Sequence, residues 1–290
     1  MWIDFNDKGH LVATDRDRID LLNRLSTNKL TTLRSGQLRQ TVFTNSKARI
    51  IDVVTVLHRG EEVLIITGDN RQEVMESWLR RNIFFNDKFQ LTVADNLHHI
   101  GVFGENAPEE IGARWQMGDQ EFVEADNGVI IANLGYEFWI LGPEATLQPL
   151  KDSIEPANRQ QYDAWRIEQG IPSTTSELTE EYIPLEVGMW DAVNFNKGCY
   201  TGQEIIARME SRGKLAKMLV KVSMSNEIPA GTELFDENGK SAGVITSAVE
   251  RQGLAIVRSA LAESGHTLTA GGHQTVTVGS PAGHYEPDYS

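Results

Sequence analysis

The chain begins with one amphipathic helical pattern. From Thr14, with Asp17 three residues later in a variant of the capping box, apolar side chains recur at Ile19, Leu22 and Leu25. This spacing places them on one face of a helix. We therefore expect a helix that begins just after Thr14.

After Gly36 the pattern changes to short runs rich in valine and isoleucine. The runs cover residues 40–44, 49–57 and 63–67, and Asn45–Ser46 and Arg59–Gly60 interrupt them. Such runs separated by turn residues are typical of antiparallel strands. We predict an antiparallel meander.

Helices and hairpins alternate irregularly over the next hundred residues. Asp69 can cap a helix with Val74, Trp78 and Leu79 on its inner side. Further helices are expected over 108–115 and 160–170, and strands over 89–93, 100–103, 129–132 and 136–141. Because regular βαβ alternation is missing, the predicted fold class is α+β.

The character changes again after Gly213. Predicted strands cover 218–222, 232–235, 243–247, 254–258 and 274–278, separated by turn residues. This pattern predicts a small C-terminal β-barrel. We expect a region 1–213 of two interwoven α+β modules, a barrel domain 214–290, and a frayed tail after Pro281.

Composition narrows the classes of protein. At 290 residues with 40% hydrophobic and 23% charged residues, the chain is typical of globular proteins. It has no apolar run of about 20 residues, and Asp4 and Asp7 argue against a signal peptide. A single cysteine excludes an intramolecular disulfide or a cysteine-only metal site within one chain. We expect a cytoplasmic protein without a metal site or a membrane partner.

The charge is negative but unevenly distributed. A net charge of -14 disfavours direct binding to nucleic acid. Within residues 14–49 and 197–221, however, cations outnumber anions. These two basic islands predict a face that binds a small anion, although solvated surface charge would explain either island alone.

The segment from Lys197 to Glu204 carries the most chemistry. Thr201 and Glu204 have the spacing of a capping box, so we expect a helix beginning just after Thr201. The positive end of that helix and the Lys197 cation would favour the thiolate form of Cys199. The alternative is a buried cysteine that packs as a small apolar side chain. The polar, glycine-bracketed setting favours a reactive thiol.

A second candidate is the run Trp165-Arg166-Ile167-Glu168 near the end of a predicted helix. A carboxylate can accept a paired N–H edge, such as that of a pterin, and an indole offers a stacking surface. A structural tryptophan and a surface glutamate are the simpler interpretation of this run taken alone.

Two other patterns do not indicate catalytic sites. Ser241 matches G-x-S-x-G, but it precedes a strand beside an Asn–Gly turn, whereas a nucleophile elbow requires strand, turn and helix. His98 and His99 would face opposite sides of a strand and could not bind one metal together.

The run Lys197 to Glu204 resembles, position for position, the K-G-C-Y-x-G-Q-E signature of the YgfZ family. That family is related to the folate-dependent aminomethyltransferase (T-protein) of glycine cleavage. The resemblance extends to the segments 25–36, 49–52 and 166–172. Together they cover most of residues 15–210.

The resemblance implies a cloverleaf of antiparallel-sheet modules around a folate pocket. It places Glu168 at the carboxylate that recognises the pterin and Trp165 at a tryptophan that contacts folate, with Arg166 beside them. Cys199 would be the family's essential thiol, with Lys197 as its partner. We also expect the signature residues Tyr200 and Gln203 to contact the cofactor, which is tetrahydrofolate or a one-carbon-substituted form.

Three functions remain open. The resemblance implies an accessory factor for assembly or repair of iron–sulfur enzymes that indirectly supports tRNA thiomodification. The first alternative is a folate-dependent one-carbon (aminomethyl) transferase, in which Asp52 orients the substrate amine. It is disfavoured because T-protein has two consecutive aspartates where this chain has Asp52-Val53. The second alternative is a non-catalytic interaction module with a relict pocket.

Overall fold

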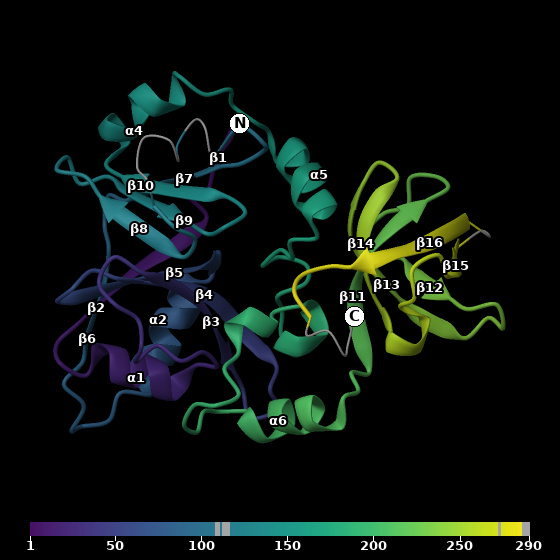
Figure 1. The fold of residues 1–290 in the computed structure, drawn as a ribbon, viewed down its shortest axis with the longest axis horizontal. Helices are drawn as coiled ribbons and strands as arrows, with labels where there is room; N and C mark the ends of the chain where they lie inside the picture. Colours follow the sequence, from purple (N-terminus) through teal and green to yellow (C-terminus); the bar gives the residue numbers. More distant parts are fainter. Residues whose placement is uncertain (108–110, 112–116, 272–273, 286–290) are drawn as a thin grey trace. The chain divides into compact units, whose positions relative to one another are not determined.

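The chain forms two compact units (Figure 1). The computed structural model describes residues 1–107, 111, 117–271 and 274–285. Unit 1 comprises Met1–Phe43 and Asp52–Arg159, and unit 2 comprises Thr44–Ile51 and Gln160–Ser290. The helix predicted over 108–115 falls outside the described residues apart from Ile111. The domain boundary predicted near residue 214 stays a prediction.

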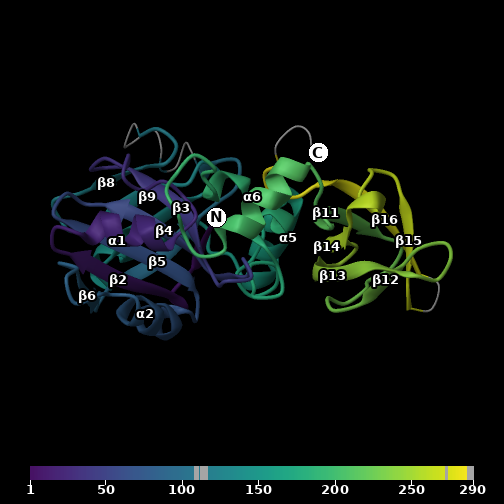
Figure 2. The same ribbon diagram turned by 90° about the horizontal axis from the view of Figure 1, so that it is seen from below.

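Unit 1 is built on two five-stranded antiparallel sheets. One has the order β1-β7-β10-β9-β8, with β1 Trp2–Asp4, β7 His98–Val102, β10 Phe138–Gly142, β9 Ile130–Asn133 and β8 Glu121–Glu124. The other has the order β3-β4-β5-β2-β6, with β3 Leu38–Thr44, β4 Ile50–His58, β5 Glu62–Asp69, β2 Lys8–Thr14 and β6 Gln90–Val93. Helix α2 (Gln72–Arg81) packs on β2 and β5 (Figure 2), and α4 (Glu144–Lys151) packs on β10.

The predicted meander is confirmed as β3, β4 and β5. The predicted start of the first helix is wrong, because Thr14 is the last residue of β2 and α1 covers Arg18–Leu25. The Asp17 side chain makes no cap hydrogen bond to α1 and instead accepts the Lys88 N–H at 2.8 Å. In α2 the buried side chains are Met75 and Leu79, so Leu79 faces inward as predicted, whereas Val74 is 40% exposed. Strands β1, β2 and β8 were not predicted.

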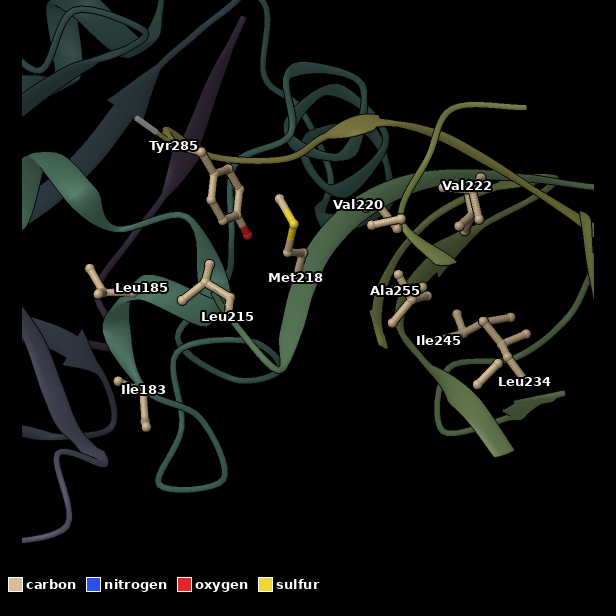
Figure 3. Packing of buried hydrophobic residues seen from close by; sticks show 14 of the residues in the cluster. Ile183, Leu185, Leu215, Met218, Val220, Val222, Leu234, Ile245, Ala255 and Tyr285 are labelled. Atoms are coloured by element: carbon tan, nitrogen blue, oxygen red, sulfur yellow. The ribbon is translucent and has the colours of Figure 1, made fainter. Parts of the chain in front are cut away.

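The C-terminal part of unit 2 is a closed barrel, which confirms the predicted α+β class with a C-terminal barrel. The strand order is β11-β14-β13-β12-β15-β16, with β11 Lys217–Met224, β14 Gln252–Arg258, β13 Ser241–Val249, β12 Glu233–Phe235, β15 Thr267–Ala270 and β16 Gln274–Pro281. Side chains such as Val220, Leu234 and Ile245 fill its interior, as Figure 3 shows. The same apolar cluster continues through Leu215 to Leu185, so the barrel core is continuous with the segment that precedes it.

A buried polar network joins helix α5 (Arg159–Gln169) to the barrel. The Arg166 guanidinium is 5% exposed, and its Nη2 donates to Ser247 Oγ on β13 at 2.9 Å. Ser247 Oγ donates to Glu177 Oε1 at 2.6 Å, and Arg166 Nη1 lies 3.7 Å from Glu177 Oε2. Arg166 Nε also donates to Asp163 Oδ1 at 2.5 Å. The network fixes which face of α5 turns towards the barrel.

The segment after Pro281 is anchored through Tyr285, so the predicted fraying is wrong for residues 282–285. Gly283 N–H donates to the Gly170 carbonyl, and the Tyr285 hydroxyl donates to the Glu186 carbonyl at 3.0 Å. Gly188 and Gly283 approach each other so closely that a Cβ on either would meet backbone atoms at 2.8 Å or less. Residues 286–290 lie outside the described part of the chain.

Removing one acid from the α5 network should destabilise the protein strongly. Glu177→Ala leaves the buried Arg166 charge without its fully buried counter-ion, and such a change costs about 3–5 kcal/mol of unfolding free energy. Glu204→Ala is the control, since the Glu204–Arg208 pair is exposed and is worth under about 1 kcal/mol. Urea denaturation of both variants gives the comparison. Equal losses would contradict the assigned role of Glu177.

Candidate functional site

Helix α5 presents a ring and a carboxylate on one face. Trp165 and Glu168 are three residues apart, so their side chains are neighbours on the helix surface. Trp165 is half-buried beside Tyr162, with ring centroids 5.7 Å apart, and Glu168 is exposed. Within the described part of the chain the Glu168 carboxylate has no hydrogen-bond or ion-pair partner, although Lys221 Nζ donates to its main-chain carbonyl at 2.6 Å. The pair can offer a stacking surface beside an acceptor for two donors.

Arg166 lies between these two residues in sequence but points into the barrel network. Its Nε, Nη1 and Nη2 atoms all donate to groups within unit 2. Its main effect on any ligand at Trp165 and Glu168 is therefore to fix the orientation of α5.

Cys199 is exposed and lies in a loop that precedes helix α6 (Gln203–Arg212). The predicted capping box is wrong: α6 begins at Gln203, its N-cap residue is Gly202, and no side chain caps it. Glu204 instead pairs with Arg208 at 2.7 Å, and the Thr201 carbonyl accepts the Thr44 hydroxyl at 2.5 Å.

Gly202 is required by its backbone conformation and by a close approach. Its φ is +87°, in the left-handed region that favours glycine. A Cβ there would also lie 2.9 Å from Ala48 Cα and from the Asn45 carbonyl oxygen. The start of α6 is thereby held against the turn before β4, within unit 2. The backbone is therefore fixed at Gly202, three residues after Cys199.

Lys197 and Tyr200 form a second feature of this loop. Lys197 Nζ lies 5.4 Å from the centroid of the Tyr200 ring, within cation–π range. Burial lowers the pKa of Lys197 to about 8, because desolvation disfavours the charged amine. Near neutral pH a larger fraction of this amine is therefore neutral than for a solvated lysine.

An open hollow of about 470 Å³ adjoins this loop. Ser46, Gln203 and Arg208 line it together with Tyr200, whose side chain is otherwise buried in the barrel-side core. Gln203 is thus placed where a ligand could reach it. Tyr200 offers one edge at most, because it is 8% exposed.

Asp52 belongs to unit 1, whereas the other predicted site residues belong to unit 2. Its carboxylate is 2% exposed and accepts the Gly68 N–H at 3.1 Å and the Val53 N–H at 2.9 Å. Burial raises the pKa of Asp52 to about 7, against the opposing effects of the Gly68 N–H and of the Arg71 and Lys8 charges. Asp52 can therefore take up or release a proton near neutral pH.

Three cations of the first basic island are engaged within the fold. Arg24 pairs with Asp20 and Asp87, and Arg39 donates to the Lys29 carbonyl. In the same island, Arg49 donates to the Glu181 carbonyl. These cations stabilise loops and have little capacity left for a ligand.

Neither a metal cluster nor a membrane helix is found among the described residues. No group of three or more His, Cys, Asp or Glu side chains there could hold a metal ion. In the same residues, no helix combines the length and apolar character needed to cross a bilayer.

The comparisons with known proteins agree with the motif and the barrel. The family model for the CAF17 C-terminal beta-barrel domain matches residues 217–283. The "tRNA-modifying protein YgfZ" of Hamiltonella defensa is 26% identical over 85% of this chain and 78% of its own length. The expected resemblance is confirmed.

Relatives and fold extend the similarity to aminomethyltransferases. The aminomethyltransferase of Thermoanaerobacter pseudethanolicus is 25% identical over 91% of this chain and 80% of its own length. The crystal structure of the glycine cleavage system aminomethyltransferase T from Bartonella henselae has a TM-score of 0.85 at 16% identity and covers 96% of this chain and 84% of that one. The fold is therefore that of the T-protein.

A cluster of charged and aromatic side chains near Asp52 was not predicted from the sequence. Lys8 Nζ lies 3.0 Å from Asp69 Oδ1 and over the rings of Phe5 and Trp139, at 5.3 and 5.2 Å from their centroids. No local pattern indicates this cluster, because its members come from four segments of unit 1. The only local hint is the Gly68-Asp69 pair at the end of a predicted strand.

Asp52→Asn should remove a pH dependence of stability. The folded state binds a proton at Asp52 up to about pH 7, whereas the unfolded chain releases it near 3.9, so the carboxyl lowers the unfolding free energy as pH rises between these values. Between pH 5 and pH 8 the variant should gain about 2–3 kcal/mol relative to the unmodified protein. Urea denaturation at pH 5, 6, 7 and 8 measures the difference. A difference that is constant with pH would contradict the assignment.

Proposed function

We propose that the protein binds tetrahydrofolate, or a one-carbon-substituted form, and acts as an accessory factor in the assembly or repair of iron–sulfur enzymes. The observation that carries the folate part is the pairing of Trp165 and Glu168 on the exposed face of α5. An indole face suits the flat pterin, and a carboxylate without a partner suits its paired N–H donors. The similarity to an aminomethyltransferase sequence supports the same ligand.

In this proposal each residue has a separate task. Glu168 accepts the pterin donors, Trp165 stacks on the ring, and Arg166 holds α5 in place from within the barrel. Gln203 contacts the ligand at the start of α6, with Tyr200 at its edge. Tetrahydrofolate would supply a carrier for a one-carbon unit.

Cys199 is the proposed reactive thiol, with the Lys197 amine two residues away. The thiol is exposed, and the loop that carries it is fixed at Gly202. Since one cysteine cannot hold an iron–sulfur cluster alone, any cluster would need ligands from a client protein. The clients are iron–sulfur enzymes or their assembly machinery, and the similarity to a tRNA-modifying protein, YgfZ, supports an indirect link to tRNA modification. We propose a cytoplasmic location and no direct contact with nucleic acid.

A one-carbon transferase is the second candidate, and Asp52 is the observation that favours it. A carboxyl group that titrates near pH 7 in a buried setting is suited to proton transfer with a substrate amine. Turnover of methylene-tetrahydrofolate with an amine donor, lost in Asp52→Asn, would establish this function.

Tetrahydrofolate binding should depend on Glu168. Glu168→Gln removes a charged hydrogen-bond acceptor and should weaken binding roughly tenfold to hundredfold, since such bonds contribute about 1.5–3 kcal/mol. Gln160→Ala, at an exposed position on the same helix, is the control and should bind as the unmodified protein does. Isothermal calorimetry under anaerobic conditions measures both. Absence of binding by the unmodified protein would instead indicate an interaction module with a relict pocket.

The accessory role should depend on the thiol. Cys199→Ser is a small change, a hydroxyl in place of a thiol, and it removes the nucleophilic sulfur. In cells that lack the protein, this variant should fail to restore the activity of an iron–sulfur enzyme while still binding tetrahydrofolate. Full restoration by Cys199→Ser would refute the role of the thiol and leave the folate site untouched.

A further inference from the structure

A row of polar groups crosses three adjacent strands of unit 1. The strands are β4, β5 and β2, which are neighbours in that order. Asp52 on β4 accepts the Gly68 N–H from β5, and the next residue, Asp69, accepts Lys8 Nζ from β2 at 3.0 Å. Lys8 and Asp52 are thus linked through two consecutive residues of one strand.

A β-bulge creates this arrangement. Lys8 pairs with Asp69, but His10 pairs with Ile66, so β5 contains one residue more than β2 between the two pairs. An extra residue at a bulge leaves the ladder and can redirect its groups. The Gly68 N–H accordingly points at the Asp52 carboxylate. At the bulge the Gly68 N–H is left without a partner from the β5–β2 ladder, and the Asp52 carboxylate accepts its hydrogen bond.

The ammonium group of Lys8 is held in a fixed place. Its side chain is 11% exposed, and the rings of Phe5 and Trp139, which are 4% and 5% exposed, face it at 5.3 and 5.2 Å. Two aromatic faces and the Asp69 carboxylate surround the charge. Because little water reaches it, its field is screened less than that of a surface lysine.

We infer that Lys8 is a positioning residue for Asp52: held by Asp69, Phe5 and Trp139, its ammonium supplies positive charge that allows the buried Asp52 carboxylate to be an anion at neutral pH. The inference rests on the second candidate function, the one-carbon transferase, only for the use of that anion, which is to meet the amine of a substrate. A buried carboxylate without nearby positive charge would stay protonated in this pH range.

The other groups around Asp52 act with or against Lys8. Arg71, just before α2, is the cation with the larger effect on Asp52 and Lys8 is the second, while the Gly68 and Val53 N–H groups also stabilise the anion. Asp69 opposes them, since its charge partly neutralises Lys8, and it lies 3.9 Å from Arg159. Substitution of Lys8 or of Asp69 therefore measures the net effect of the Lys8 charge on the ionisation of Asp52.

Lys8→Met keeps an unbranched side chain of similar length beside both rings and removes the charge. The Asp52 carboxyl, assigned by comparison with Asp52→Asn, is followed by ¹³C NMR from pH 5 to pH 9. Its midpoint should rise by about one pH unit or more in Lys8→Met, a tenfold or greater tightening of proton binding, and stay at the unmodified value in Lys8→Arg. An unchanged midpoint in Lys8→Met would overturn the inference.

Lys151→Met is a matched control. Lys151 has the same side-chain exposure of 11%, lies 5.1 Å from the Trp2 ring centroid and is 3.9 Å from Asp4 Oδ2. Its loss should leave the Asp52 midpoint unchanged. An equal rise in Lys151→Met and Lys8→Met would show a general effect of net charge and would also overturn the inference.

Asp69→Asn supplies a test of opposite sign should Lys8→Met fail to fold. Removal of the Asp69 charge strengthens the field of Lys8 at Asp52, so the midpoint should fall; a rise would overturn the inference. None of these measurements requires a ligand. Failure of tetrahydrofolate to bind would refute the proposed function, whereas the titration decides the role of Lys8 separately.

Discussion

The buried guanidinium of Arg166 fixes the orientation of α5, the helix that carries Trp165 and Glu168 of the candidate site. A charge at 5% exposure is stable only when its donors are satisfied, and Glu177, Ser247 and Asp163 satisfy them. Asp163 belongs to α5 itself, whereas Ser247 and Glu177 lie outside it, so these two partners fix the rotation of the helix about its axis. Residues one before and two after Arg166 then face outwards, and these are Trp165 and Glu168.

Unit 1 also contains a buried ionisable group that must be satisfied, and here it is an acid, Asp52. Asp52 has few donors for a carboxylate buried to 98%, so its proton affinity rises until it titrates near pH 7. The Gly68 N–H at the bulge of β5 and the charges of Arg71 and Lys8 limit this rise. Burial of these polar groups carries an energetic cost that an apolar packing of the same strands would not have, which points to a role beyond stability.

Local patterns predicted the elements well and their ends poorly. The runs of valine and isoleucine identified β3, β4 and β5, because both faces of these strands are mostly buried. Thr14 and Thr201 were misjudged as caps, since a capping box is a short pattern that also occurs by chance in loops. At Thr201 the deciding interaction is the close approach of Gly202 to Ala48, which depends on residues about 150 positions apart.

The candidate site shows the same division. The signature from Lys197 to Glu204 and the run from Trp165 to Glu168 could be found because each lies within one short segment. Lys8, Asp69 and Trp139 could not, because only the folded unit brings them together: Lys8 and Asp69 meet through the pairing of β2 with β5, and Trp139 comes from the other sheet. This difference bears on the choice between an accessory factor and a transferase. The residues carried by motifs, Cys199 and Glu168, are those that the accessory role uses. The cluster that tunes Asp52 is the one that transfer chemistry would use, and an Asp52 that titrates near neutrality would let a single carboxylate both hold an amine and exchange its proton. The ionisation of Asp52 is thus the property on which the two functions differ most.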